Sequence, residues 1–548
     1  MPNHIYKPSS ALLNLSRRDA WTLDDAYMGV FVVGGTGSGK SSGSGRSLAH
    51  AYLRAGLGGL VLCAKPSEAD TWRRYCKETG RLSSLIVLGG SSGHRFNFLE
   101  YELARIDGGS SKTPFALEAL LKIYEAMQAA DGVKSDESFW RNSVRLLLSH
   151  SIDSLYAAYG RLRFPELMDF INSAARSEEE FNSPQWRENS FHYLTLEKAA
   201  KNPTKPANST DFAAVLRYFR GFCELDKKTK SNIIATLEAM VMDFQKGDLA
   251  KIFCTDTTIV PELSHHGAVI VLDFPVKEWQ RGGQIAQQIF KFAWQRAIER
   301  RRVEETTRPC FLWADEYQLF VSAYDAEFQS TARSSRACSV YMTQSIPALR
   351  EAVKSTTPTE NVDALLNNFQ TTIIHTIKDP TTQEWAANLI GKGIQWRYTE
   401  SHGVSHGSTW GQSQGSNKGW SWGKSSNTSH GSSSQGNSGS SSTSGMQSSN
   451  SNSWGRGWGR SSQTSHGVTD SSSGGSNHSE NHGGSHGANE GVSRAQTMDY
   501  LVQPSFFGTA LRMGGARNNF LVDGVIMQGG RTWQHNNATW LVCTFPQK

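Results

Sequence analysis

Residues 29–42 read GVFVVGGTGSGKSS, and this stretch decides the fold. It contains the pattern G-x-x-x-x-G-K-[ST], in which glycines allow backbone N–H groups to converge on a phosphate. An apolar run at 30–33 leads into the pattern and a helix-compatible run at 41–57 follows it, as a strand–loop–helix unit requires. The stretch therefore predicts a phosphate-binding loop made of Gly34, Gly35, Thr36, Gly37, Ser38, Gly39, Lys40, Ser41 and Ser42.

The chemistry of this loop indicates ATP and Mg²⁺ as cofactors. Lys40 can reach the β- and γ-phosphates of a nucleotide, and the Ser41 hydroxyl can bind Mg²⁺. The amino terminus of the following helix adds its positive dipole end. The alternative is a chance glycine-rich turn, which the flanking strand and helix patterns disfavour.

A second apolar run, CFLWADEYQ at 310–318, supplies the acidic residues that hydrolysis at such a loop usually needs. Asp315 ends the run and can hold Mg²⁺ through water, while Glu316 beside it can polarise the attacking water. Asp273, at the end of VIVLDFP, competes for the metal role and ranks below Asp315 because it has no neighbouring carboxylate. The alternative for Asp315 and Glu316 is a solvated acid pair at a strand end.

The run ARSSRACSVYMTQS at 332–345 adds further polar candidates. Gln344 follows a strand that we expect beside the first one, so its side chain can contact the γ-phosphate or water and report nucleotide state. Arg333 and Arg336 precede this strand, and arginines in this place reach a neighbouring subunit's γ-phosphate in ring ATPases. The alternatives are an ordinary strand-end glutamine and surface arginines.

Short apolar runs recur along the chain with helical patterns between them. Most runs are continuous rather than alternating, which is typical of strands buried on both faces of a parallel sheet. The alternation of strands and helices predicts an α/β fold with a doubly wound core. The predicted strands lie at 30–33, 59–64, 85–90, 268–273, 310–315, 338–342 and 371–377, and predicted helices lie at 68–79, 283–305 and 380–391.

Changes in composition divide the chain into parts. Residues 112–250 carry long helical patterns and few strand patterns, so we expect an all-α domain inserted between strands of the sheet. Residues 400–493 consist mainly of Ser, Gly, Asn, His and Trp. The predicted organisation is a nucleotidase core at 1–111 and 251–399, the all-α insertion at 112–250, a low-complexity insertion at 400–493, and a return to the core at 494–548.

The low-complexity insertion is expected to be disordered, because apart from its tryptophans it has little that could form a core. The alternative is a long protruding β-hairpin, since the flanking sequences resemble strands. Its aromatic and basic residues could stack on unpaired bases and contact phosphates, although a solvated loop is preferred and an arm for partner proteins is a third reading. These residues are Trp410, Trp420, Trp422, Trp454 and Trp458, with Lys418, Lys424, Arg456 and Arg460.

Charge and composition place few further limits. The chain of 548 residues has a formal net charge of +6, a mildly basic balance that is compatible with a polyanion partner such as DNA. None of the seven cysteines forms a C-x-x-C pair, so buried free thiols in a reducing cytosol are expected. No apolar run reaches the roughly 18 residues of a membrane span and the amino terminus has no signal-peptide core, which favours a cytoplasmic protein, peripheral at the inner membrane face at most.

Several blocks together resemble the type IV secretion coupling-protein family, the conjugative DNA-transfer P-loop ATPases (TraG/TraD-like) related to FtsK/HerA-type translocases. The resemblance covers most of the chain outside the low-complexity insertion. Besides the loop and the acidic pair, it rests on ESFWRNSVRLLL at 137–148, VIVLDFPVKE at 269–278, ARSSRACSVYMTQS at 332–345 and DYLVQPSFFGTALRMGG at 499–515.

The resemblance implies a RecA-like P-loop core with an all-α domain, assembled as a homohexamer around a channel. It implies that Lys40 and Ser41 hold phosphate and Mg²⁺, that Asp315 and Glu316 form the acidic pair, that Gln344 is the sensor and that Arg333 is the preferred arginine finger. Many members carry an amino-terminal membrane anchor that this sequence lacks, so a soluble branch or a separate membrane-anchored partner is expected. The family often has an aspartate where this chain has Ala64, which leaves a role for Lys65 open.

The preferred function is an ATP-driven translocase that moves DNA, most simply single-stranded, in a conjugation or type IV secretion-like system. Its expected partners are DNA, further copies of the chain, and secretion-channel or relaxase-type proteins. The alternative is an ATPase that recruits protein substrates and delivers them to a secretion channel. A third reading, a scaffold that binds nucleotide without turnover, is disfavoured by the intact pair of Asp315 and Glu316.

Overall fold

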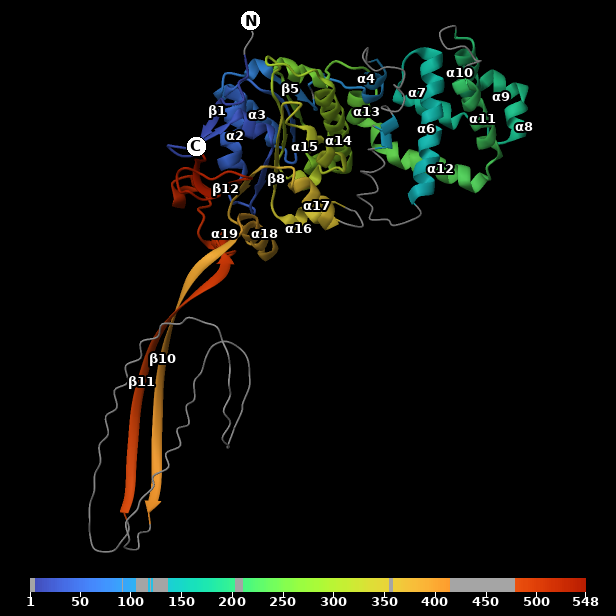
Figure 1. Cartoon of the computed structure of the whole chain (residues 1–548). Helices are drawn as coiled ribbons and strands as arrows, with labels where there is room; N and C mark the ends of the chain where they lie inside the picture. The colour runs from blue at the N-terminus through green and yellow to red at the C-terminus, as the bar shows by residue number, and fades with distance from the viewer. Residues whose placement is uncertain are drawn as a thin grey trace. The chain divides into compact units, whose positions relative to one another are not determined.

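A computed structural model describes residues 5–90, 92–104, 117–118, 120–121, 137–202, 210–353, 358–413 and 479–548. The chain divides into two compact units, one formed by residues 1–390 with 502–548 and the other by residues 391–501. Figure 1 shows the elements of each unit.

The larger unit is organised around a nine-stranded sheet with the strand order β13-β12-β9-β3-β8-β7-β4-β6-β5. The strands from β9 to β5 are all parallel to their neighbours, whereas β12 runs antiparallel to β9 and to β13. The mostly parallel α/β sheet predicted from the sequence is therefore confirmed. The strands are β3 (Val30–Val33), β4 (Gly58–Leu62), β5 (Leu85–Leu88), β6 (Val269–Leu272), β7 (Cys310–Ala314), β8 (Ala337–Thr343), β9 (Thr371–Ile374), β12 (Leu521–Gln528) and β13 (Trp540–Pro546).

Helices cover both faces of this sheet, which explains why its strands are continuous apolar runs. On one face, α2 (Arg46–Arg54) and α3 (Glu68–Glu78) pack through Tyr52 and Trp72 onto Phe311 of β7. On the other face, Phe31 of β3 contacts Trp385, which belongs to α18 (Pro380–Ile390). Four further helices connect the strands from β6 to β9. Along the chain, α14 (Val276–Arg300) lies between β6 and β7, α15 (Tyr324–Thr331) between β7 and β8, and α16 (Ile346–Ala352) and α17 (Pro358–Leu366) between β8 and β9.

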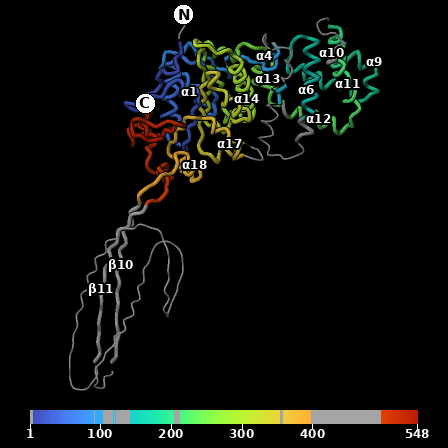
Figure 2. Tube along the Cα trace, in the orientation of Figure 1, coloured from blue at the N-terminus to red at the C-terminus, as the bar shows by residue number. Residues whose placement is uncertain are grey.

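Between β5 and β6 the described residues form helices joined by turns and loops, with no strand among them, as the sequence predicted (Figure 1 and Figure 2). A buried aromatic cluster holds several of these helices together: the His192 ring stacks on Phe170 and meets Phe219 edge-on, at centroid distances of 4.1 and 4.5 Å. The helices are α4 (Phe98–Ala104), α6 (Glu137–Tyr159), α7 (Phe164–Asn172), α8 (Glu178–Asn182), α9 (Pro184–Asn189), α10 (Phe191–Ala200), α11 (Thr210–Glu224), α12 (Lys227–Val241) and α13 (Gly247–Phe253). The boundaries at 112 and 250 stay a prediction.

Short elements complete the larger unit. The hairpin of β1 (Ala11–Asn14) and β2 (Ala20–Thr22) leads into α1 (Leu23–Tyr27), whose cap is Thr22. The helix α19 (Phe506–Thr509) precedes β12. All seven cysteines are buried and none is in a disulfide, as expected. Within the described residues, no helix combines the length and apolarity that a membrane crossing requires.

The smaller unit is a two-stranded antiparallel hairpin of β10 (Lys392–Ser413) and β11 (Ser479–Tyr500) (Figure 1). Its register runs without interruption from the pair of Lys392 with Tyr500 to the pair of Ser413 with Ser479. Over residues 400–413 and 479–493 the backbone follows the hairpin alternative, and the expectation of disorder stays a prediction. Residues 414–478 lie outside the described residues, and with them Trp420, Trp422, Trp454, Trp458, Lys418, Lys424, Arg456 and Arg460; Trp410 pairs with His482 through its backbone.

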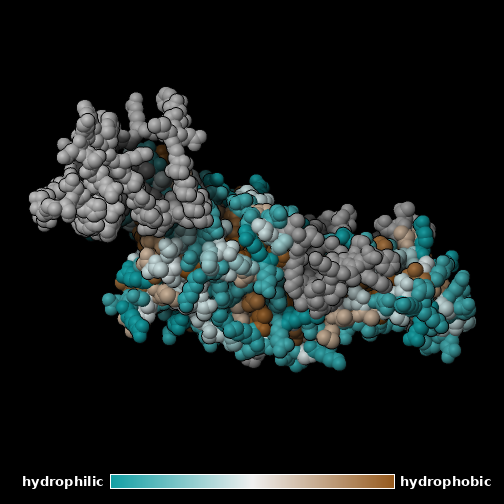
Figure 3. Space-filling model, turned by 90° about the horizontal axis from the view of Figure 1, so that it is seen from below, coloured by the Kyte–Doolittle hydropathy of each residue, from teal (hydrophilic) through white to brown (hydrophobic). Residues whose placement is uncertain are grey.

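Hydrophilic residues cover most of the described surface on the face shown in Figure 3. Hydrophobic residues on that face form small groups among them.

Candidate functional site

The candidate site lies at one edge of the sheet, where three neighbouring parallel strands end. The loop at 34–40 follows β3, Gln344 follows β8, and the pair of Asp315 and Glu316 follows β7. Because β3, β8 and β7 are adjacent and parallel, their carboxyl ends meet at the same edge, which is where α/β sheets bind ligands. The strand order thus brings together residues that lie up to 310 positions apart.

The loop backbone is anchored to the strands on both sides of β3. The Gly34 N–H donates to the Thr343 carbonyl at 3.2 Å, and the Gly35 N–H donates to the Thr376 carbonyl at 2.9 Å. Gly39 has a φ of +87°, and a Cβ atom there would lie 2.5 Å from the Val522 side chain of β12. Only glycine fits this position, because both the backbone conformation and the approach of β12 exclude a side chain.

The helix after the loop begins with one π-helical turn at Ser41–Gly45 before α2. In this turn the Ser44 Oγ lies 2.7 Å from the His375 Nε2, and the His375 Nδ1 lies 2.8 Å from the Asp523 carbonyl oxygen. Burial lowers the pKa of His375 to about 4, so the ring is neutral at pH 7. A neutral ring donates from Nδ1 to the carbonyl and accepts the Ser44 hydroxyl at Nε2, which ties the loop to β9 and β12. Sequence reasoning missed both residues, and the available signal was a histidine inside the apolar run 371–377.

Two oxygen ligands suited to Mg²⁺ lie next to each other. The Ser41 hydroxyl donates to Asp315 Oδ2 at 2.5 Å, and Asp315 is buried. A hydroxyl and one carboxylate fit Mg²⁺, which protein sites of this kind hold with few side chains, the remaining ligands being phosphate oxygens and water. In the described part of the chain, no group of three or more His, Cys, Asp or Glu residues could hold a metal ion by itself.

Glu316 is buried at the centre of the site, and its carboxylate contacts two lysines and two glutamines. Its Oε1 lies 2.9 Å from Lys65 Nζ and 3.8 Å from Lys40 Nζ, and its Oε2 accepts from the amides of Gln318 at 2.8 Å and Gln344 at 2.9 Å. Burial alone would raise the pKa of Glu316, but the two ammonium groups and the Gln318 hydrogen bond outweigh it and lower this pKa to about 2. Glu316 is therefore ionised, as a water-polarising carboxylate must be.

Gln344 links Glu316 to the loop. Its Nε2 donates to Glu316 Oε2 at 2.9 Å, while its Oε1 accepts from the Thr36 hydroxyl at 3.0 Å. A shift of the loop would therefore be transmitted to the carboxylate through one amide group. This geometry agrees with the predicted sensor position, and the sensor role stays a prediction.

The structure does not bring Asp273 or the two arginines into this site. Asp273 follows β6 and so lies at the same edge of the sheet, but β6 is two strands away from β7. Arg333 precedes β8, so it lies at the opposite edge of the sheet, where its exposed side chain pairs with Asp24 at 3.2 Å. Arg336 donates to the backbone carbonyls of Glu305 and Thr307 at 3.0 Å, so its side chain stabilises the turn before β7.

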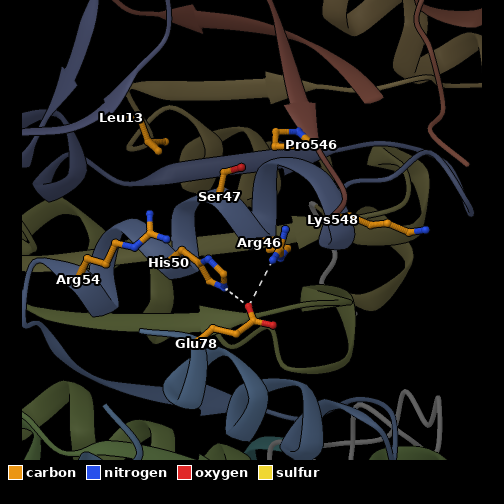
Figure 4. A pocket seen from close by; sticks show the side chains of 8 residues that line it. All are labelled: Leu13, Arg46, Ser47, His50, Arg54, Glu78, Pro546 and Lys548. Carbon is orange, nitrogen blue, oxygen red and sulfur yellow. Dashed lines mark hydrogen bonds and ion pairs between the residues drawn. The ribbon is translucent and has the colours of Figure 1, made fainter. Parts of the chain in front are cut away.

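A pocket of about 450 Å³ lies along the outer face of α2 (Figure 4). Glu78 binds Arg46 at 3.3 Å and His50 at 3.0 Å across it. Near this pocket, Gln547 donates to the Ser42 hydroxyl at 2.7 Å. The pocket is lined by Leu13, Arg46, Ser47, His50, Arg54, Glu78, Pro546 and Lys548.

No protein-family model matches this sequence, and no curated protein matches it significantly. Among solved structures, the bacterial conjugative coupling protein TrwBdeltaN70 in its unbound monoclinic form matches with a TM-score of 0.52 and 12% identity, over 98% of this chain and 90% of that one. The chain therefore has the fold of a conjugative coupling protein.

Two further solved structures match at lower TM-scores. Plasmid coupling protein TrwB in complex with ADP and Mg²⁺ matches with a TM-score of 0.45 and 16% identity, over 67% of this chain and 76% of that one. VirB4 of Thermoanaerobacter pseudethanolicus matches with a TM-score of 0.38 and 12% identity, over 66% of this chain and 80% of that one.

Proposed function

We propose that this protein is a coupling ATPase that uses ATP hydrolysis to move DNA in a conjugation or type IV secretion-like system. The observation that carries the proposal is the convergence of Lys40, Ser41 and Asp315 with Glu316 at one sheet edge. The fold shared with TrwBdeltaN70 supports the choice of DNA transfer among the many functions of P-loop proteins.

Each residue has a defined task in this proposal. Lys40 and the loop amides bind the phosphates, and Ser41 and Asp315 hold Mg²⁺, which when bound neutralises charge on the β- and γ-phosphate oxygens. Glu316 orients the attacking water and accepts its proton as the water oxygen bonds to the γ-phosphorus. The bond to the bridging oxygen breaks, and its electron pair leaves with ADP.

We propose that the protein works as a ring, most simply a homohexamer, because Arg333 and the loop belong to opposite edges of the same sheet. A strand of seven residues spans roughly 20 Å, so Arg333 cannot complete the site of its own chain. In a head-to-tail ring the Arg333 of one subunit would face the loop of the next. Contacts with relaxase-type or channel proteins, and a peripheral position through a membrane-anchored partner, are part of the same proposal.

The experiment that tests this function measures ATP hydrolysis by the purified chain alone, with single-stranded DNA and with duplex DNA. The Lys40→Ala variant is the blank, because it removes the phosphate-binding ammonium. We expect hydrolysis that single-stranded DNA stimulates and that the blank lacks. If a channel or relaxase-type protein stimulates hydrolysis and DNA does not, the proposed function changes from DNA movement to protein delivery. If no hydrolysis is observed under any condition, the ATPase proposal is overturned.

A further inference from the structure

The geometry points to Lys65 as a positioning residue that restrains Glu316 in the nucleotide-free protein and releases it when Mg²⁺ and ATP bind. This inference rests on the proposed ATPase function and deepens it, since it names how turnover is held back at rest. It assigns a task to Lys65, whose role could not be decided from the sequence.

Lys65 reaches the site from the strand next to the acidic pair. It follows β4, which pairs with β7, and its Nζ lies 2.9 Å from Glu316 Oε1 and 3.9 Å from Asp315 Oδ2. The turn that carries it is fixed, because the Glu68 N–H donates to the Lys65 carbonyl and Glu68 Oε2 accepts from the Ala64 N–H. The Lys65 side chain is 37% exposed, so its ammonium group can leave the site without crossing the core.

Three hydrogen bonds and one ion pair surround the Glu316 carboxylate while Lys65 is in place. Lys65 donates to Oε1 and the amides of Gln318 and Gln344 donate to Oε2, while Lys40 lies 3.8 Å from Oε1, beyond hydrogen-bond distance. A carboxylate has about four lone-pair positions, so Lys65 holds one of the two on Oε1, and the charge of Lys40 lies close to the other. Because a water proton must compete with two ammonium groups at Oε1, Lys65 limits the access of water to Glu316.

Nucleotide binding would remove two of these contacts for electrostatic reasons. Lys40 is drawn from Glu316 to the phosphates, which carry more negative charge. The Lys65 ammonium lies 3.9 Å from Asp315, so it and a divalent cation held by Asp315 would repel each other. The other groups facing this point are Glu68, whose pKa burial and the Asp315 charge raise to about 8, and the neutral amides of Gln318 and Gln344.

Amine labelling tests the contact without any turnover. Lys65 in the purified full chain is acylated with a lysine-selective reagent, and labelling is quantified by peptide mass spectrometry, with exposed Lys77 of α3 as the internal control. We expect Lys65 to react at least about threefold faster in Glu316→Gln and in the wild type with Mg²⁺ and adenosine 5′-O-(3-thiotriphosphate), while Lys77 is unchanged. Equal Lys65 rates in all three samples would overturn the inference.

Turnover of Lys65 variants tests the restraint itself. We expect Lys65→Met to hydrolyse ATP about three- to tenfold faster than the wild type without DNA, with a KM for ATP within twofold. Lys65→Arg keeps a cation at the carboxylate and should retain the low rate, and Lys77→Met is the matched control. A rate for Lys65→Met equal to or below that of the wild type would reject the restraint, including the case in which Lys65 only supports the fold.

The two proposals fail in different ways. If the wild type hydrolyses ATP and Lys65→Met is no faster, the restraint is wrong and the ATPase function stands. If neither chain hydrolyses ATP with or without DNA, the ATPase function is wrong and the restraint falls with it. A labelling difference would then report only an ion pair.

Discussion

Glu316 combines a strained backbone with a carboxylate that accepts three hydrogen bonds. Its φ of 54° lies in the left-handed region, which non-glycine residues avoid at a cost of about 1–3 kcal/mol. Strain of this kind persists where surrounding contacts fix the residue, and here two lysines and two amides do so. The conformation aims the side chain at the loop rather than along the strand, so it belongs to the proposed chemistry.

Replacement of Glu316 by Gln tests this assignment directly. The amide keeps the size of the side chain but cannot accept the water proton, so we expect kcat to fall about a hundredfold or more while ATP still binds. Fluorescent-nucleotide binding and a hydrolysis assay provide the two readouts. The matched control is Glu327→Gln on the exposed side of α15, and a Glu316→Gln variant as active as this control would remove Glu316 from the mechanism.

The buried His375 predicts how stability depends on pH. Its pKa is about 4 in the folded protein and near 6.5 in the unfolded chain, so between these values the unfolded chain binds more protons. Stability is therefore lost as pH falls from about 6.5 towards 4, by about 3 kcal/mol at most from this residue. In thermal melts over this range, His375→Asn should show a weaker pH dependence than the exposed control His535→Asn. Equal slopes would mean that His375 titrates normally.

At the scale of single residues, spacing alone predicted the loop and the acidic pair because each is contiguous in the sequence. Gln344 could also be placed, since it follows a strand. Lys65 and His375 could not be given tasks, because their partners Glu316 and Ser44 come from distant strands whose order the sequence does not state.

At the scale of elements, β12 is as important to the loop as β3. A Cβ at Gly39 would lie 2.5 Å from Val522, whereas a Cβ at Gly37 would have nothing within 4 Å, although both glycines have positive φ. Sequence reasoning identified β3 and its parallel neighbours from their apolar runs. It assigned 494–548 only to the core, because two antiparallel strands at a sheet edge carry no motif.

This contact predicts a difference between two similar substitutions. We expect Gly39→Ala to weaken nucleotide binding by at least about tenfold, and Gly37→Ala to cost only the backbone strain of about 1–2 kcal/mol. The double variant Gly39→Ala with Val522→Ala should recover part of the loss, because it removes the clashing methyl groups. Isothermal titration with ATP measures all three variants, and the absence of any recovery would show that β12 does not set the loop geometry.

At the scale of the whole molecule, Arg333 and the phosphate-binding loop lie at opposite edges of the sheet. Arg333 lies on the edge opposite the loop and pairs only with the partly exposed Asp24 in the described structure. The sequence predicted the candidate finger from its place before a strand. That Arg333 lies far from the loop could not be predicted, because it depends on the direction of β8 in the sheet.

Mixed complexes test completion of the site by a neighbouring subunit. We expect Arg333→Ala and Lys40→Ala each to abolish hydrolysis, and their mixture to recover part of it, because some interfaces then combine an intact loop with an intact arginine. Two affinity tags confirm that both variants enter the same complexes. Arg302→Ala, whose side chain is 90% exposed, is the control. Verified mixed complexes without recovery would exclude Arg333 as a finger acting between subunits.

The hairpin of β10 and β11 also has a consequence for engineering. The chain enters this unit at Gly391 and leaves it at Leu501, and these two residues share a hydrogen bond of 3.0 Å. An insert with adjacent ends places little strain on its host, whatever its length. The same junction should therefore accept a fluorescent protein in place of residues 392–500, giving a reporter-tagged ATPase whose cooperative melt matches that of the parent.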